Sequence, residues 1–192
     1  NIEATEKEKE IFYTALYQSY LSPALYMDVD DRYRGRGGSV HRAGGFRDHT
    51  TFSLWDTYRN VHPFLSLVYP GLQLDLVRSM LEMYRESGWL PKWELLSMET
   101  AVMVGDPATP VLYDTYARGL TGFDLETAYA AARKAATQLE HNKLRPALAW
   151  YDSLGYIPEN RAGIGGTVST TLEYNISDWN LAQLARLLGK DA

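Results

Sequence analysis

Three acidic residues in this 192-residue chain stand beside aromatic or bulky apolar neighbours. Asp56 follows Trp55, Glu99 closes a segment that opens at Trp93, and Glu173 lies in the run Thr-Leu-Glu-Tyr. Such pairs suit a sugar, because an aromatic ring packs on the apolar face of a pyranose while a carboxylate accepts hydrogen bonds from its hydroxyls. Two carboxylates can also cleave a glycosidic bond, one as acid and the other as base or nucleophile. The pattern predicts carbohydrate chemistry.

A structural role is open for each acid as well. Ser53 and Asp56 have the spacing of a capping box, with Asp in place of the usual Glu, and Thr170 and Glu173 match such a box. Glu99 has the position of a first-turn acid that faces the positive end of a helix. All three acids can therefore be interpreted as helix-capping residues.

The aromatic and histidine residues nearby have core interpretations. His62 precedes Pro63 within an apolar face, which is more typical of a hydrogen-bonded core histidine than of a catalytic base. Large aromatic residues are more often core than ligand platforms, and this holds for Trp55, Trp93, Trp150 and Trp179.

The composition argues against several function classes. With 19 Lys and Arg against 24 Asp and Glu, the net charge is −5, which disfavours nucleic acid or an anionic membrane surface as the main partner. The chain has no cysteine, so a disulfide scaffold, a thiolate nucleophile and a Cys-ligated metal are excluded. No apolar run is long enough to predict a membrane span.

Motifs of other chemistries are absent or incomplete. Phosphate-binding glycine loops, the H-E-x-x-H metalloprotease motif and the G-x-S-x-G nucleophile motif do not occur. Asp28 and Asp30 open like a calcium loop, but Arg32 and Tyr33 then stand where that loop needs an oxygen ligand and a glycine. The arginines of residues 28–51 are predicted to pair with neighbouring aspartates on a surface loop; a lone Arg-Gly-Gly nucleic-acid element is the alternative.

Helices must position the candidate residues. Helical spacing of apolar residues covers 6–21, 53–69, 73–87, 99–118, 125–140, 146–154 and 169–188. Pro63 is expected to kink or break the second helix, Gly88 to end the third, and Asp124 to cap the fifth. No strong period-two strand appears. The sequence predicts an all-α chain of about seven helices with one long Gly/Arg-rich loop, as in a helical toroid or solenoid.

Several segments resemble the helical catalytic domain of the family-92 glycoside hydrolases, in the same order along the chain. They are 12–17 (FYTALY), 53–59 (SLWDTYR), 88–95 (GWLPKWEL), 99–105 (ETAVMVG), 122–124 (GFD) and 171–174 (TLEY). An ordered set of motifs is far more specific than any one of them. The resemblance covers essentially the whole chain.

The resemblance implies a calcium-dependent, inverting exo-α-mannosidase that removes terminal α-linked mannose, α-1,2-linked first of all, from glycans. Residues 1–192 would be the N-terminal portion of an (α/α)6 toroid without a second domain. Trp55 and Asp56 fall where the family contacts the terminal mannose. The residue pattern adds Glu99 as a contact, with Arg59, His62 and Glu173 as secondary candidates.

The resemblance also implies what lies elsewhere. The family's catalytic acid and base, and its calcium ligands, are expected beyond residue 192, so the chain alone is expected to be inactive and to need the rest of a parent polypeptide. A periplasmic or secreted location is implied. Two positions depart from the family: Asp106-Pro107 stands where many members have Tyr-His, and Ser97-Met98 where many have Gly-Asn.

Two rival functions stay open. One is a non-catalytic helical module that binds carbohydrate or acts as a scaffold. The other is a different toroid glycosidase or lyase that uses Asp56 and Glu99 directly. Replacing Asp56 with Asn discriminates in part, because a contact role predicts lost mannose affinity, whereas a capping role predicts lost stability.

Overall fold

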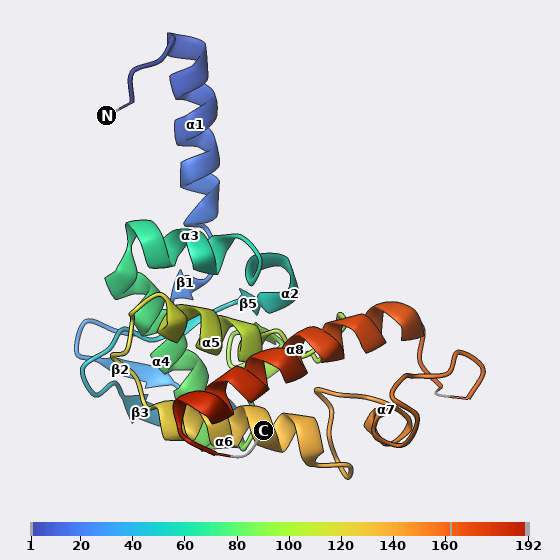
Figure 1. Cartoon of the computed structure of the whole chain (residues 1–192). Helices are drawn as coiled ribbons and strands as arrows, with labels where there is room; N and C mark the ends of the chain where they lie inside the picture. Colours follow the sequence, from blue (N-terminus) through green and yellow to red (C-terminus); the bar gives the residue numbers. More distant parts are fainter. Residues whose placement is uncertain (1, 162, 191–192) are drawn as a thin grey trace.

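Helices dominate the computed structural model, which describes residues 2–161 and 163–190 (Figure 1). Eight α-helices lie in these residues: α1 (Glu6–Ser19), α2 (Leu54–Thr57), α3 (Val61–Val68), α4 (Pro70–Ser87), α5 (Ala108–Ala117), α6 (Leu125–Thr137), α7 (Leu148–Leu154) and α8 (Thr167–Leu187). The predicted mostly helical fold is confirmed, with one helix more than the expected seven.

Short strands occur between the helices. They are β1 (Ala24–Leu25), β2 (Arg32–Arg34), β3 (Val40–Arg42), β4 (His49–Thr50), β5 (Phe52–Ser53), β6 (Trp93–Leu95) and β7 (Met98–Glu99), with a 3₁₀ turn η1 (Arg36–Gly38) between β2 and β3. Antiparallel pairing joins β1 to β4 and β2 to β3, while β5, β6 and β7 form one three-stranded sheet. The long loop expected over 28–51 therefore contains short irregular strands.

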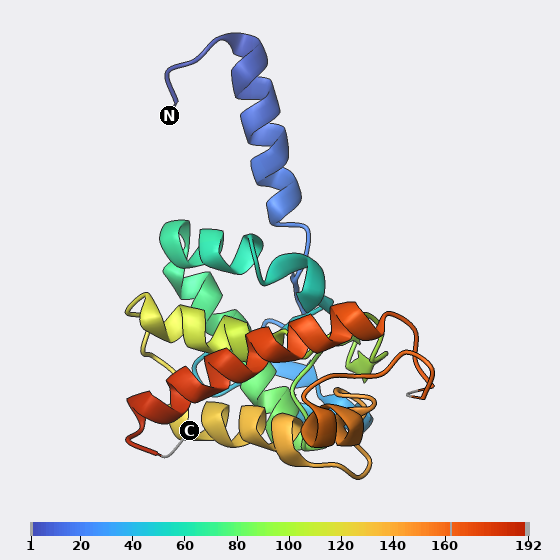
Figure 2. The same cartoon turned by 45° about the vertical axis from the view of Figure 1, so that its right-hand side comes forward.

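Helix α4 supplies the centre of the core. Its Leu76, Val77 and Met80 are fully buried, and α3, α5 and α6 pack around it. Helix α8 in turn packs on α5 and α6, and it crosses them in both views of Figures 1 and 2. The face of α6 that enters this core carries small residues, among them Ala128 and Ala132, so neighbouring helix backbones can approach closely.

Two predicted helix boundaries are confirmed. The Asp124 carboxylate accepts the Thr127 backbone N–H at 3.0 Å, which satisfies one of the donors that a helix start leaves free. Gly88 ends α4 with φ of 77°, a left-handed conformation that favours glycine.

The predicted helix over 53–69 is two helices, and its break does not lie at the proline. Residues 58–60 separate α2 from α3, and Asn60 caps α3 by accepting the Val61 N–H. Pro63 is the third residue of α3, where a backbone N–H has no intrahelical partner, so the missing donor costs little. The helix predicted over 99–118 likewise begins only at Ala108.

The β5–β6–β7 sheet was not predicted. Ser53 is paired with Trp93 in register, and Glu94 with Glu99, so the sheet joins two of the candidate segments. Its strands have two or three residues, which is too short for a period-two pattern to appear in the sequence.

The β2–β3 hairpin is fixed to α4 through Glu86. The Glu86 carboxylate accepts the Tyr33 hydroxyl at 2.8 Å and the Arg36 backbone N–H at 2.6 Å. Arg32 pairs with Asp30 at 2.6 Å, as predicted for this loop. Arg36 does not pair with a nearby aspartate, because its guanidinium reaches inward to a glutamate of β7 instead.

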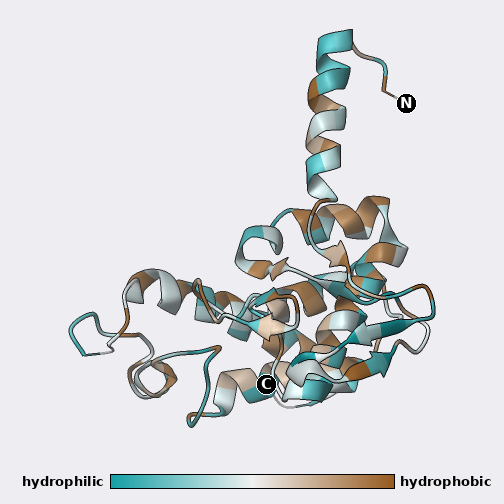
Figure 3. Ribbon diagram, turned by 180° about the vertical axis from the view of Figure 1, so that it is seen from behind, coloured by the Kyte–Doolittle hydropathy of each residue, from teal (hydrophilic) through white to brown (hydrophobic). Residues whose placement is uncertain are grey.

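Helix α1 extends away from the rest of the chain (Figures 1 and 2). None of its residues is buried, and the large side chains of Ile11 and Tyr17 are exposed on it. Figure 3 shows hydrophobic, brown bands along this helix. Among the described residues, no helix combines the length and apolar character needed to cross a bilayer.

Candidate functional site

The segment that carries Trp55 and Asp56 is set by the three-stranded sheet. β5 pairs with β6, and the Leu54 N–H donates to the Lys92 carbonyl, so α2 begins directly at the sheet. Leu54 is fully buried beneath this turn. Of the next two residues, Trp55 is half-buried and Asp56 is exposed.

Glu173 of α8 draws three side chains of residues 55–59 together. One carboxylate oxygen accepts the Trp55 indole N–H at 3.3 Å and also binds Arg59, while the other accepts the Tyr58 hydroxyl at 2.8 Å. The Arg59 guanidinium also lies over the Tyr58 ring, 4.3 Å from its centroid. Burial and the Glu173 carboxylate raise the pKa of Tyr58, so the phenol stays protonated and donates. The orientation of Trp55 is therefore fixed from α8.

A glycine allows α8 to approach this closely. Gly105 has φ of 79°, and a Cβ at this position would lie 2.8 Å from the Glu173 Cβ. An alanine here would meet both a strained backbone and a clash. This glycine closes the segment 99–105 on which the resemblance partly rests.

Glu99 is held by backbone donors. Its carboxylate accepts N–H groups from Lys92 at 2.9 Å, Trp93 at 2.9 Å and Ala101 at 2.8 Å. The Arg36 guanidinium lies 3.3 Å away as its ion-pair partner. Glu99 thus shapes the turn that supports Trp93, and it shares no hydrogen bond with Asp56 among those that the described residues make.

Glu94 is a buried acid that sequence reasoning missed. Its side chain is inaccessible and accepts the Thr50 hydroxyl at 2.8 Å and the Thr51 N–H at 2.9 Å, which ties β6 to β4 and to the residue that links β4 with β5. Nothing in the sequence distinguishes it from an exposed acid, since its strand is only three residues long. Arg36 was missed for a related reason, because its position in a glycine-rich loop indicated the surface.

His62 lies in the core. It is 1% exposed, and its Nδ1 is 3.0 Å from the Gln73 side-chain oxygen. Burial lowers its pKa to about 4, so the ring is neutral at physiological pH. This position confirms the core interpretation of the residue and leaves no surface for a sugar.

The capping interpretations of the three acids are wrong. Ser53 makes no side-chain cap to α2, and Thr170 and Glu173 both lie inside α8, whose first cap residue is Gly166. Glu99 lies in a strand rather than in a first helical turn. Among the three, Asp56 alone has a side chain with no hydrogen bond to the described residues, and it is exposed at the residue that follows Trp55 in α2.

Asp106, one of the positions that depart from the family pattern, belongs to a separate buried cluster. Arg145, which is 1% exposed, donates from Nε to Asp106 at 3.0 Å and from Nη1 to Asp178 at 2.6 Å. Its guanidinium also lies 4.9 Å from the Tyr174 ring centroid. Asp106 therefore has a structural partner that compensates its burial.

No metal-binding cluster appears in this part of the molecule. In residues 2–161 and 163–190, no group of three or more histidine or acidic side chains could hold a metal ion.

Comparison with known proteins places the chain in a glycosidase family. The model of the glycosyl hydrolase family 92 catalytic domain matches residues 1–192. A curated relative from Arthroderma benhamiae, described as an uncharacterized secreted glycosidase, is 29% identical over a match of 185 residues; the match covers 85% of this chain and 24% of that protein. The chain belongs to glycosyl hydrolase family 92.

Solved structures agree in fold. A family GH92 α-mannosidase from Bacteroides thetaiotaomicron, in complex with mannoimidazole, has a TM-score of 0.91 and 38% identity, with 99% of this chain and 24% of that chain covered. A family GH92 inverting mannosidase from the same organism has a TM-score of 0.83 and 31% identity, with 93% and 25% covered. The chain spans about a quarter of the length of these relatives.

Proposed function

We propose that this chain supplies terminal-mannose contacts to an exo-acting α-mannosidase that cleaves α-linked, and first of all α-1,2-linked, mannose. The observation that carries the proposal is the exposed, unengaged carboxylate of Asp56 at the residue after Trp55, whose ring orientation is fixed by Glu173. The likeness to a mannosidase solved with mannoimidazole supports it.

The roles of the site residues follow from their contacts. The Trp55 ring offers an apolar face to the pyranose, and Asp56 accepts hydrogen bonds from its hydroxyls. Arg59, whose side chain is 47% exposed, adds donors at the rim. Glu173 and Glu99 are positioning residues, because protein donors already engage their carboxylates. Preorganised groups of this kind bind with a smaller entropic cost.

Proton transfer is assigned to the rest of a parent polypeptide. An inverting glycosidase needs an acid at the leaving oxygen and a base across the ring, about 6.5–9.5 Å apart so that water fits between them. The other two candidate carboxylates, Glu99 and Glu173, are already engaged by protein donors, so neither can complete such a pair with Asp56. We therefore expect the chain to bind mannose without releasing it, within an (α/α)6 toroid whose calcium ligands lie outside these residues.

Helix α1 exposes several large apolar side chains, which favours a partner that packs on it. We propose that this partner is the remaining part of the parent polypeptide. A secreted or periplasmic location is proposed in line with the curated relative, which is described as secreted.

The first experiment is a titration of the chain with methyl α-D-mannoside, followed through the Trp55 indole N–H resonance. We expect saturable shifts that Asp56→Asn abolishes. Asp152→Asn is the matched control, because it removes another exposed helical carboxylate, in α7. Shifts that survive in Asp56→Asn would contradict the assigned contact.

A second assay tests the catalytic part of the proposal. The chain is incubated with α-1,2-mannobiose, with calcium or with a chelator, and free mannose is measured. No release is expected from the chain alone. Calcium-dependent release would instead place the acid and base within residues 1–192.

A non-catalytic carbohydrate-binding module is the second candidate. The observation that favours it is that only one of the three candidate carboxylates is unengaged, which suffices for binding and not for acid–base cleavage. Adding the downstream segment of the parent reading frame discriminates, since only the enzyme gains mannose release.

A further inference from the structure

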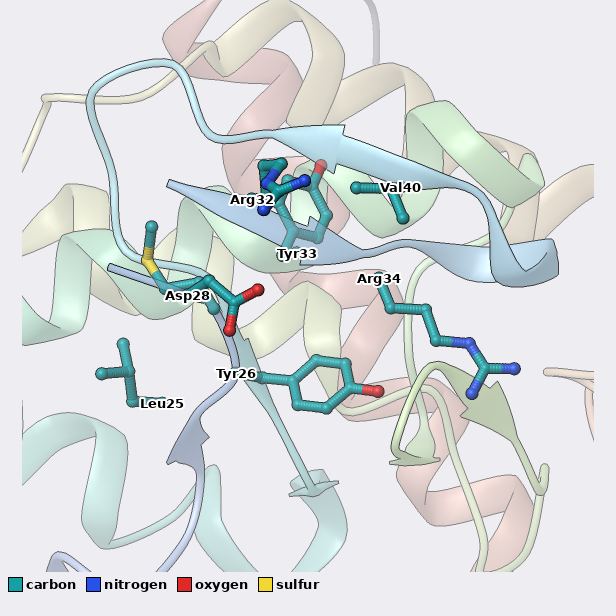
Figure 4. A pocket seen from close by; sticks show the side chains of 8 residues that line it. Leu25, Tyr26, Asp28, Arg32, Tyr33, Arg34 and Val40 are labelled. Carbon is teal, nitrogen blue, oxygen red and sulfur yellow. The ribbon is translucent and has the colours of Figure 1, made fainter. Parts of the chain in front are cut away.

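A hollow of about 430 Å³ lies between residues 25–28 and the β2–β3 hairpin, and Trp55 is not among its lining residues. Figure 4 shows its polar side chains. The Tyr26 ring lies between the Asp28 carboxylate and the Arg34 guanidinium, and Leu25 and Val40 form apolar parts of the wall. This size falls within the usual range of small-molecule sites, roughly 300–1,000 Å³.

The polar groups of this hollow have unused hydrogen-bonding capacity. In the described residues, the Tyr26 hydroxyl, the Asp28 carboxylate and the Arg34 guanidinium make no hydrogen bond or ion pair. Their neighbours on the same hairpin differ. Arg32 is paired with Asp30, and the Tyr33 hydroxyl is bound to Glu86. Arg32 and Tyr33 line the hollow as well, so Tyr26, Asp28 and Arg34 are the lining residues whose polar ends stay unengaged.

The backbone around the hollow is fixed. The Tyr26 N–H donates to the Asp48 carbonyl at 2.8 Å, and the Asp28 N–H donates to the Arg32 carbonyl at 2.7 Å. The Ser97 hydroxyl donates to the Arg34 carbonyl at 2.6 Å. Ser97 follows β6, the strand that pairs with β5 just before Trp55, so the hollow and the mannose site are braced by one sheet.

The chemistry of the hollow selects a neutral, hydroxyl-rich ligand. Arg32 also lines the hollow, but its guanidinium is paired with Asp30. Asp28 and Arg34 then contribute one charge of each sign and no net charge, which disfavours a phosphate or another anion. A phenol ring with aliphatic neighbours suits the apolar face of a sugar, while Asp28 accepts from hydroxyls and Arg34 donates to them. An apolar peptide would leave both charges without partners.

From this geometry we infer a second carbohydrate site, in which Tyr26, Asp28 and Arg34 bind an inner pyranose of the glycan. The inference rests on the proposed function, which assigns the terminal mannose to Trp55 and Asp56. A second sugar held on the same chain would raise the affinity for oligosaccharides over single mannosides.

The test compares methyl α-D-mannoside with a linear α-mannotriose, each titrated into the ¹⁵N-labelled 192-residue chain. Tyr26→Ala and Arg34→Ala are expected to weaken trisaccharide binding about tenfold and to leave methyl mannoside binding unchanged. Asp28→Asn, which keeps the shape, should act in the same direction. Arg42→Ala is the matched control, because it removes an exposed arginine from the same hairpin outside this hollow.

The outcomes separate the two proposals. Equal affinity for the mannoside and the trisaccharide, or trisaccharide binding that the three variants leave unchanged, overturns the second site while the Trp55 assignment stands. Trisaccharide shifts around Tyr26 without a mannoside shift at Trp55 overturn the proposed function and keep the second site. Absence of any sugar-dependent shift overturns both.

Discussion

Helix α8 carries two acids that bind arginine, and the two clusters differ in their access to solvent. Glu173 holds Arg59, whose side chain is 47% exposed, beside the exposed Asp56. Asp178 holds Arg145, which is 1% exposed and is also bound to the buried Asp106. The same type of ion pair therefore occurs at an open surface in one place and in the interior in the other. Only the surface pair lies where it can fix the orientation of side chains that contact a ligand.

The interior cluster should show the largest effect on stability. Arg145→Met is expected to lower the free energy of unfolding by about 3–5 kcal/mol, because Asp106 is left as an unpaired buried charge. Chemical denaturation followed by circular dichroism measures the loss. Arg118→Met, which breaks an exposed pair with Asp114, should cost less than about 0.5 kcal/mol.

A double variant sharpens the interpretation. Adding Asp106→Leu to Arg145→Met should recover much of the loss, because no buried charge remains, whereas water can solvate the partly exposed Asp178. If the double variant is no more stable than Arg145→Met, the loss comes from packing rather than from the uncompensated charge.

The two clusters also show which features of the fold and the site could be predicted from the sequence alone. The helical elements and the ends at Gly88 and Asp124 were predictable, because periodicity and caps are local. The partner of Asp106 is 39 residues away in sequence, and the Trp55 partner Glu173 is 118 residues away. No local pattern reports such pairs, so the sequence identified the three candidate acids Asp56, Glu99 and Glu173 but offered a capping interpretation for each that is wrong.

The pH dependence of stability should separate the interior from the surface. Burial lowers the pKa of Lys92, whose ammonium donates to the Leu144 carbonyl next to Arg145, to about 8. Between pH 8 and the unfolded value of 10.5, the unfolded chain binds a proton that the folded chain does not. The free energy of unfolding therefore rises with pH in this window.

Denaturation at pH 7.5 and 9.0 tests this, because tyrosines with an ordinary pKa near 10 are still mostly protonated over this range. A rise of about 1–2 kcal/mol is expected for the natural chain. The rise should vanish in Lys92→Met and persist in Lys190→Met, which alters an exposed lysine paired with Glu126. A rise of equal size in Lys92→Met would show that another group is responsible.

The open cluster should respond more weakly in stability and more strongly in ligand binding. Glu173→Gln keeps the size but loses the charge that binds Arg59 and the two aromatic donors, so about 1–2 kcal/mol should be lost. The Trp55 indole N–H resonance should shift or broaden, and methyl mannoside affinity should fall. Glu126→Gln, in an exposed pair, should change neither. Unchanged mannoside affinity with a shifted indole resonance would contradict the positioning role of Glu173.

The smallest stability change is expected at the residues closest to the sugar. The Ser53 side chain does not cap α2, and the Asp56 side chain makes no hydrogen bond to the described residues. The free energies of unfolding of Ser53→Ala and Asp56→Asn should therefore each stay within about 0.5 kcal/mol of that of the natural chain. The two variants should nevertheless differ, since only Asp56→Asn removes a charged acceptor from the Trp55 surface and so abolishes mannoside binding. Parallel denaturation and titration of both measure this. A loss above 1 kcal/mol in both would restore the capping interpretation, because a helix cap acts on stability whether or not a sugar is present.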